Sequence, residues 1–200
     1  MGKKNKNIKV ISNPVYKYYV AYGSNLNVEQ MRYRCPDATP IGTAIINGYE
    51  LLYKGSKSGA YLTIEKSPDG KVPVVIWRVS AKDEKSLDRY EGFPNFYYKR
   101  DLELKVKLFK PSKSFYGKQH SGITQVLDCF VYIMHENRQL GVPNRYYVDG
   151  CAVGYRTFGF DRATLTAAFD RTISRMNTPV NSGYTERIPD NIYDRWMCSV

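Results

Sequence analysis

The chain has 200 residues, a formal net charge of +11 at neutral pH, 42% apolar residues and 18 tyrosines. This length suits one domain with its own core, and the apolar content excludes a chain that is disordered throughout. No apolar run approaches the roughly 20 residues of a membrane helix, and residues 1–13 carry charge without an apolar signal region, so we expect a soluble, cytoplasmic protein with no membrane partner.

The first half of the chain is predicted to alternate between strands and a short helix. Residues 15–22 are β-branched and aromatic, which favours a strand. A short helix follows over residues 27–35 and ends at a proline, and residues 42–53 again indicate strands. Residues 59–80 are predicted to form a hairpin that turns at Pro68-Asp69-Gly70.

The second half begins with a well-marked helix. Ser80 suits the N-cap, Asp83 stands at the capping-box position, and Gly92 lies beyond the helix end. The later predicted elements are a strand at 97–109, a loop at 110–122, a strand at 125–134 and a helix at 161–176. Many strands, few helices and no regular βαβ alternation predict an α+β fold with a curved or barrel-like sheet.

We expect three parts along the chain: a flexible basic arm at residues 1–14, one domain at 15–176, and a C-terminal tail at 177–200 that is rich in turn formers. The cysteines and histidines are scattered with no CxxC pair, so neither a disulfide framework nor a metal site is supported. They are Cys35, Cys129, Cys151, Cys198, His120 and His135.

The positive charge also fits a nucleic-acid-binding protein, because phosphates attract Lys and Arg and bases stack on aromatic rings. However, the basic residues are spread along the whole chain, and their densest cluster lies in the N-terminal arm. No RNP-type motif, GXXG loop or Cys/His finger spacing is present. Nucleic-acid binding therefore remains only a minor alternative.

The sequence YVAYGSNLNVEQM, residues 19–31, breaks a predicted strand at Gly23-Ser24-Asn25 just before a helix. Such a break leaves backbone N–H groups unpaired at the helix start, and the glycine lets a ligand approach the main chain. This arrangement predicts an anion site, and a carboxylate suits it better than a triphosphate because no P-loop lysine follows. An ordinary turn capped by Ser24, Asn25 or Asn27 is the alternative.

Glu91 is a second unusual position. Leu87 and Glu91 are four residues apart on the predicted helix, so if Leu87 enters the core, Glu91 points inward too. Burial and the negative end of the helix dipole both disfavour the charged carboxylate, which makes Glu91 a candidate general base near neutral pH. The alternatives are a solvated surface glutamate or an ion pair with Arg89 or Arg100.

Four segments together resemble the γ-glutamylcyclotransferase-like (AIG2-like) family, and the resemblance covers residues 17–169. The segments are YGSNL, GAYLTI, SLDRYEGFPNFYYKR and VPNRYYVDGCAVGYRTFGFD. The resemblance implies a small mixed β-barrel with flanking helices, whose cavity holds a γ-glutamyl group. The chain departs from the family at Val74, where a glycine is common.

The resemblance also implies site residues and an activity. The acid/base glutamate maps onto Glu91, a cavity tyrosine maps onto Tyr97 or Tyr98, and a loop that binds the glutamyl end maps onto Tyr22, Gly23, Ser24, Asn25 and Leu26. The implied activity is an intramolecular cyclisation, of the transferase or lyase type, that forms 5-oxoproline and releases an amine or amino acid. The expected partner is a small γ-glutamyl substrate, and no metal or organic cofactor is required. A non-catalytic member of the same fold, repurposed for binding, remains an alternative.

Overall fold

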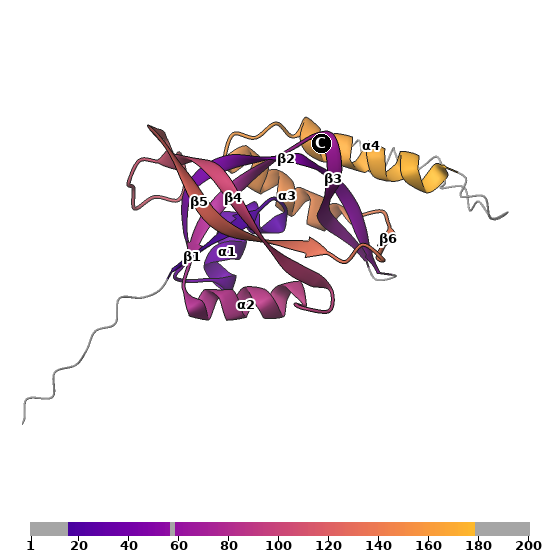
Figure 1. The fold of residues 1–200 in the computed structure, drawn as a ribbon, viewed down its shortest axis with the longest axis horizontal. Coiled ribbons are helices and arrows are strands. Elements are labelled where there is room, and N and C mark those ends of the chain that lie inside the picture. The colour runs from indigo at the N-terminus through magenta and orange to yellow at the C-terminus, as the bar shows by residue number, and fades with distance from the viewer. Residues whose placement is uncertain (1–15, 57–58, 179–200) are drawn as a thin grey trace, which may run out of the picture.

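The computed structural model describes residues 16–56 and 59–178, and Figure 1 shows its elements. In chain order they are β1 (Lys17–Ala21), the 3-10 turn η1 (Ser24–Leu26), α1 (Val28–Arg34), β2 (Thr39–Ser56), β3 (Gly59–Val79), α2 (Ala81–Glu91), β4 (Tyr97–Phe109), β5 (His120–Met134), β6 (Gln139–Leu140), α3 (Arg145–Thr157) and α4 (Ala163–Asn177). The predicted arm, and the predicted tail beyond residue 178, lie outside the described residues.

The strands form one mixed sheet in the order β3-β1-β5-β4-β2-β6. Strand β1 runs parallel to β5, whereas its other neighbour, β3, is antiparallel. Because β2 also pairs with β3, the pairings join β3, β1, β5, β4 and β2 in a closed ring. Figure 1 shows α2 and α4 on opposite sides of these strands. The predicted α+β class, with a small curved sheet and flanking helices, is confirmed.

The predicted hairpin turn at Pro68-Asp69-Gly70 is wrong. Strand β3 continues through these residues, and the segments before and after them both pair with β2 rather than with each other. The turn formers instead make an irregularity where the register shifts between Asn47 and Tyr49. Gly70 lies so close to β2 that a Cβ there would be 2.2 Å from the Tyr49 carbonyl oxygen. A glycine is therefore needed for the two strands to approach each other at this point.

The predicted helix starts and stops near the site are confirmed for α1 and α2. The Asn27 side chain caps α1 by accepting the N–H groups of Glu29 and Gln30. In α2, Ser80 and Asp83 form the capping box, and Gly92 takes the left-handed conformation with φ 63° after the last turn. These local signals fix the ends of both helices that reach the site.

Helix α3 is not among the predicted elements. It contains Gly150 and Gly154, which lower helix propensity. The Asn144 side chain caps its start by accepting the Tyr147 N–H at 2.8 Å. A Cβ on Gly154 would lie 2.4 Å from the Leu26 Cβ, so the glycine allows α3 to pack directly on η1. This packing holds the chain that follows β1 in place.

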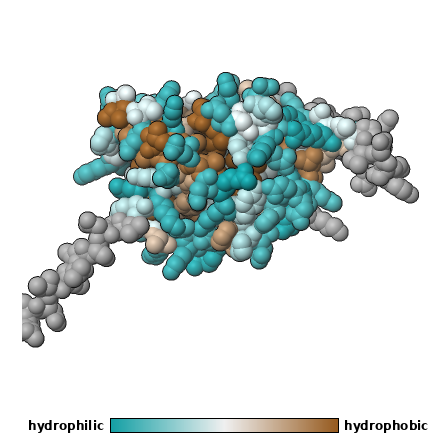
Figure 2. Space-filling model, viewed as in Figure 1, coloured by the Kyte–Doolittle hydropathy of each residue, from teal (hydrophilic) through white to brown (hydrophobic). Residues whose placement is uncertain are grey.

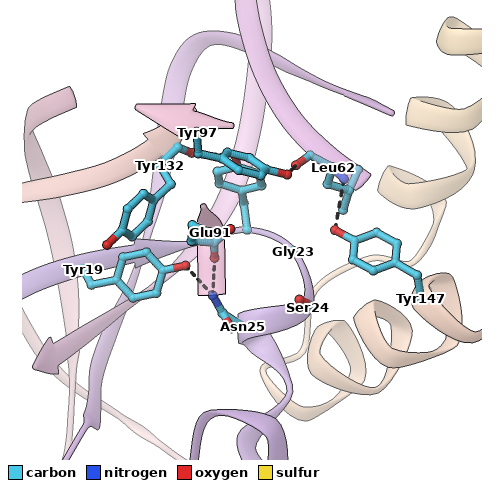
Figure 3. A pocket seen from close by; sticks show the side chains of 10 residues that line it. Tyr19, Gly23, Ser24, Asn25, Leu62, Glu91, Tyr97, Tyr132 and Tyr147 are labelled. Atoms are coloured by element: carbon cyan, nitrogen blue, oxygen red, sulfur yellow. Dashed lines mark hydrogen bonds between the residues drawn. The ribbon is translucent and has the colours of Figure 1, made fainter. Parts of the chain in front are cut away.

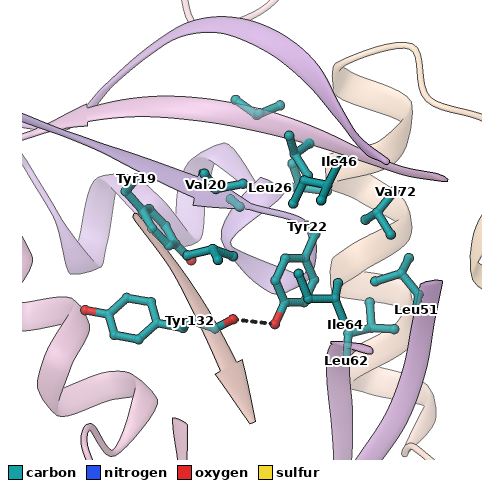
Figure 4. Packing of buried hydrophobic residues seen from close by; sticks show 14 of the residues in the cluster. Tyr19, Val20, Tyr22, Leu26, Ile46, Leu51, Leu62, Ile64, Val72 and Tyr132 are labelled. Atoms are coloured by element: carbon teal, nitrogen blue, oxygen red, sulfur yellow. Dashed lines mark hydrogen bonds between the residues drawn. The ribbon is translucent and has the colours of Figure 1, made fainter. Parts of the chain in front are cut away.

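The interior is filled by apolar side chains from the sheet and the helices (Figure 4). The largest fully buried side chains include Trp77, Tyr53, Tyr155 and Phe169. Figure 2 shows a mostly hydrophilic face with an apolar area over β4 and β5. Within the described ranges, no helix has the length and apolar character that a membrane crossing requires.

Candidate active site

A pocket opens where β1 ends, between η1 and the C-terminal end of α2 (Figure 3). It encloses about 300 Å³, counting its open mouth. Its lining residues are Tyr19, Tyr22, Gly23, Ser24, Asn25, Leu62, Glu91, Tyr97, Tyr132 and Tyr147. The pocket thus brings together Glu91 and the whole Tyr-Gly-Ser-Asn segment, which lie more than 60 residues apart in the sequence.

Glu91 reaches this pocket because it is the last residue of α2, one turn after the fully buried Leu87. The predicted inward direction is therefore confirmed. Asn25 Nδ2 donates hydrogen bonds of 2.8 Å both to Glu91 Oε1 and to the Tyr19 hydroxyl oxygen. The carboxyl group is held by a neutral amide donor at a helix end.

The two arginines considered as ion-pair partners of Glu91 are engaged elsewhere. Arg89 donates to the Ser86 hydroxyl, and Arg100 donates to the Tyr49 hydroxyl at 2.7 Å. The structure therefore does not support the ion-pair interpretation of Glu91.

Burial raises the pKa of Glu91 from 4.5 to about 7, and the nearby Arg34 charge and the Asn25 hydrogen bond oppose the rise only in part. A carboxyl group with this pKa exchanges its proton near neutral pH. It can therefore accept a proton in one step and return it in the next.

Arg34, which the sequence pattern does not single out, supports this arrangement from behind. Its Nη1 donates to Asn25 Oδ1 at 2.5 Å, and its Nη2 donates to Gln30 Oε1 at 2.7 Å. The guanidinium carbon lies 3.6 Å from the centre of the Tyr90 ring. Because Arg34 can only donate, the Asn25 carbonyl faces it and the Asn25 NH₂ group faces Glu91.

The loop supplies backbone donors from three of its residues. In the loops and turns of the described residues, the N–H groups of Gly23, Ser24 and Asn25 donate to no main-chain acceptor, whereas the Leu26 N–H donates to the Gly23 carbonyl at 2.9 Å. The Leu26 side chain is fully buried in the core and does not line the pocket. A Cβ on Gly23 would lie 3.1 Å from the Tyr147 hydroxyl, so glycine keeps this wall open.

The two candidate tyrosines of β4 face opposite ways, as neighbours on a strand do. Tyr97 lines the pocket and donates its hydroxyl to the Leu62 carbonyl at 3.0 Å. Tyr98 lies outside the pocket and donates to Glu136 at 2.7 Å. The structure thus places Tyr97, and not Tyr98, beside Glu91.

The tyrosine hydroxyl groups that line the pocket are uncharged and act as hydrogen-bonding partners. Burial raises the pKa of Tyr19, Tyr22, Tyr97 and Tyr147 well above 10.0. The Tyr22 hydroxyl donates to the carbonyl oxygen of Tyr132 at 2.7 Å (Figure 4). The Tyr19 hydroxyl accepts from Asn25 and lines the pocket, so it can donate its own proton to a ligand.

Several lining residues were not predicted: Tyr19, Leu62, Tyr132 and Tyr147. Tyr147 lies on α3 and Leu62 on β3, and only their places in segments that resemble the family pointed to them. Tyr19 and Tyr132 stand on strands whose pairing is not apparent from local sequence. Val74 is fully buried and lies outside the pocket. Among the described residues, no group of His, Cys, Asp or Glu side chains could hold a metal ion.

Sequence comparison relates this chain to known proteins. A family model described as "Gamma-glutamyl cyclotransferase, AIG2-like" matches residues 19–149. Proteins named gamma-glutamylcyclotransferase from Homo sapiens and Mus musculus are 33% and 35% identical to this chain over an alignment of 95 residues, and the matches cover 44% of this chain and 50% of each relative. The chain spans about half the length of the curated relatives it matches.

Solved structures share the fold. One, named "Gamma-glutamyl cyclotransferase", has a TM-score of 0.61 at 21% sequence identity. The alignment covers 92% of this chain and 99% of the chain in that structure. The crystal structure of an uncharacterised protein from Homo sapiens has a TM-score of 0.57 at 23% identity and covers 91% of this chain and 98% of its own. At these identities the likeness supports the fold alone.

Proposed function

Because the chain belongs to the gamma-glutamyl cyclotransferase, AIG2-like family, we propose that it cyclises the γ-glutamyl group of a small molecule to 5-oxoproline and releases the attached amine or amino acid. One observation carries the proposal. The Glu91 carboxyl, held by Asn25 and shifted to a pKa of about 7, shares a pocket with unpaired loop N–H groups.

In this proposal the loop holds the negative parts of the substrate. The N–H groups of Gly23, Ser24 and Asn25 bind the α-carboxylate or the oxyanion that forms at the γ-carbonyl. The Tyr19 hydroxyl adds a neutral donor at the same pocket. The pocket holds the substrate in the bent conformer that brings its amine close to its γ-carbonyl, and such positioning lowers the barrier by several kcal/mol.

Glu91 moves the protons. Its carboxylate first takes a proton from the α-ammonium group, and the free amine then attacks the γ-carbonyl carbon to close the five-membered ring. The protonated Glu91 next donates to the nitrogen that leaves, and the old C–N bond breaks. The ring nitrogen gives its remaining extra proton back to Glu91, from which it passes to the released amine or to water. A carboxyl with a pKa near 7 suits both directions of transfer.

The test is to incubate the purified protein with a panel of γ-glutamyl compounds and to measure 5-oxoproline by mass spectrometry. Reactions without protein give the background from uncatalysed cyclisation. We expect 5-oxoproline and the free amine to appear in equal amounts and well above that background. Binding of these compounds without any 5-oxoproline would instead favour a member of the fold that has kept binding and lost catalysis.

A further inference from the structure

A second cavity lies against the first and shares Ser24, Glu91, Tyr97 and Tyr147 with it. It has a volume of about 220 Å³, or about 540 Å³ when its open mouth is counted. Its outer wall consists of Tyr61, Tyr90 and Phe96, none of which lines the first pocket. We refer to it as the outer cavity.

The outer cavity lies where the leaving group of the reaction would be. This inference rests on the proposed function, in which Glu91 donates a proton to the leaving nitrogen. That nitrogen must therefore lie beside Glu91, with the glutamyl group on the side of the Gly23-Ser24-Asn25 loop. Because Glu91 lines both spaces, the substituent on the leaving nitrogen extends into the outer cavity.

The charge of the outer cavity limits which substituent fits. Of the residues lining it, Glu91 alone has a charged form near neutral pH, and no described Lys, Arg or His lines it. Two guanidinium groups stand against its rings, but their N–H groups are directed elsewhere: those of Arg34 to Asn25 and Gln30, and that of Arg138 to the Asn95 carbonyl. A carboxylate placed here would lose water without gaining an ion pair.

The shape of the outer cavity favours an apolar group. Tyr61 meets Tyr147 edge-on, with 5.1 Å between ring centres, and meets Phe96 in the same way at 6.4 Å. Phe96 in turn contacts Tyr97 at 5.3 Å. These rings form one cluster that an additional ring or alkyl chain can extend by stacking or edge contacts.

We propose that the outer cavity is the leaving-group site, and that it selects γ-glutamylamines whose amine carries an apolar or aromatic substituent and no carboxylate next to the nitrogen. A free amino acid is the disfavoured leaving group, because its α-carboxylate would enter a space with no cation on its described wall, close to Glu91.

Three matched substrates test this directly: γ-glutamyl-phenethylamine, γ-glutamyl-phenylalanine and γ-glutamyl-ethylamine. The first two differ only by the carboxylate, and the first and third only by the ring. We expect kcat/KM for the phenethylamine compound to exceed each of the others by about 10-fold or more. Equal or faster turnover of the phenylalanine compound would overturn the proposal. No 5-oxoproline from any of the three would count against the proposed function itself, which separates the two failures.

A substitution in the wall of the outer cavity tests whether this cavity causes the preference for an aromatic leaving group. Tyr61→Ala removes a ring from the outer cavity alone, so we expect kcat/KM to fall about 10-fold for the phenethylamine substrate and less than about twofold for the ethylamine substrate. Tyr33→Ala is the matched control, because Tyr33 is 91% exposed on α1. Tyr61→Leu, which keeps more of the volume, repeats the test if the alanine variant melts early. An equal loss with both substrates, or a loss with neither, would contradict the assignment.

Discussion

At the scale of single residues, the site depends on a carboxyl group placed where its charge is unfavourable. The direction of Glu91 follows from local periodicity, since it stands one turn after the buried Leu87. The residues that set the pKa of Glu91 could not be predicted in the same way. Arg34 acts through Asn25, and that contact depends on how α1, η1 and α2 come together in space.

Arg34 is predicted to position Asn25 and to keep Glu91 partly charged. Arg34→Met retains the length of the side chain but removes the charge and the donors to Asn25. Since the Arg34 charge lowers the pKa of Glu91, its loss should shift the rise of kcat/KM with pH, expected near pH 7 in the wild type, to higher pH. Turnover at pH 7 should fall by about 10-fold and recover in part at pH 8.5.

The complete pH profile separates this role from a structural one. A variant that is only less stable would lose activity at every pH and keep the same midpoint. An unchanged midpoint in folded Arg34→Met would therefore contradict the link from Arg34 to Glu91.

At the scale of elements, the ends of the helices follow from sequence and the long-range pairings do not. The capping box of α2 is formed by residues three apart, so local pattern suffices to place it. The path of β3 is decided by its pairing with β2 on both sides of Pro68-Asp69-Gly70, which overrides the turn preference of those residues. Helix α3 was not predicted because its two glycines lower helix propensity. They are there because other elements pack closely against them.

The close packing of α3 on η1 leads to a test with a control on the same helix. Gly154→Ala would place a Cβ 2.4 Å from the Leu26 Cβ and 2.9 Å from the Asn27 N, and backbone cannot yield easily there. We expect a loss of about 1–3 kcal/mol in the free energy of unfolding, together with lower turnover as the loop shifts. Thermal melts and 5-oxoproline formation would be measured on the same preparation.

Gly150→Ala provides the comparison. Its Cβ would meet only the flexible end of Gln30, at 3.1 Å, while the gain in helix propensity is the same. We expect this variant to be as stable as the wild type or more so. If the two variants melted alike, close packing would not be the reason for Gly154.

At the scale of the whole molecule, the closed ring of strand pairings encloses the core, and the site lies where η1, α2 and α3 meet the ends of its strands. The surface in Figure 2 is largely hydrophilic, and the basic residues are spread along the sequence. The domain boundaries predicted at residues 14 and 176 remain predictions. We expect the stability of the whole fold to report on the partly buried Glu91 carboxyl.

Global stability should depend on pH through Glu91 in a defined direction. Its pKa is about 7 in the folded chain and 4.5 ordinarily, so between these values the folded state binds more protons than the unfolded state. The free energy of unfolding therefore falls as pH rises through this window. Glu91→Gln lacks this loss and should be more stable than the wild type at pH 8, by about 1–3 kcal/mol, with the difference vanishing near pH 5.

Glu84, on the same helix, provides a control for which the change of stability with pH has the opposite sign. Burial alone would raise the pKa of Glu84, but Lys99 and Lys17 outweigh it and hold the pKa below 4.5. Its ionised form stabilises the fold above that value, and the contribution is lost as pH falls. Denaturant unfolding at several pH values should therefore show Glu84→Gln less stable than the wild type at pH 8. Glu91→Gln destabilised at pH 8 would contradict the account of Glu91.

The most direct test of the central claim is the rate of 5-oxoproline formation by Glu91→Gln beside the wild type, under the same conditions and with the best substrate of the panel. The substitution keeps the size of the side chain and removes its ability to take a proton. We predict that turnover falls by about 10²-fold or more while substrate binding largely survives. A folded Glu91→Gln protein that forms 5-oxoproline at the wild-type rate would contradict the mechanism.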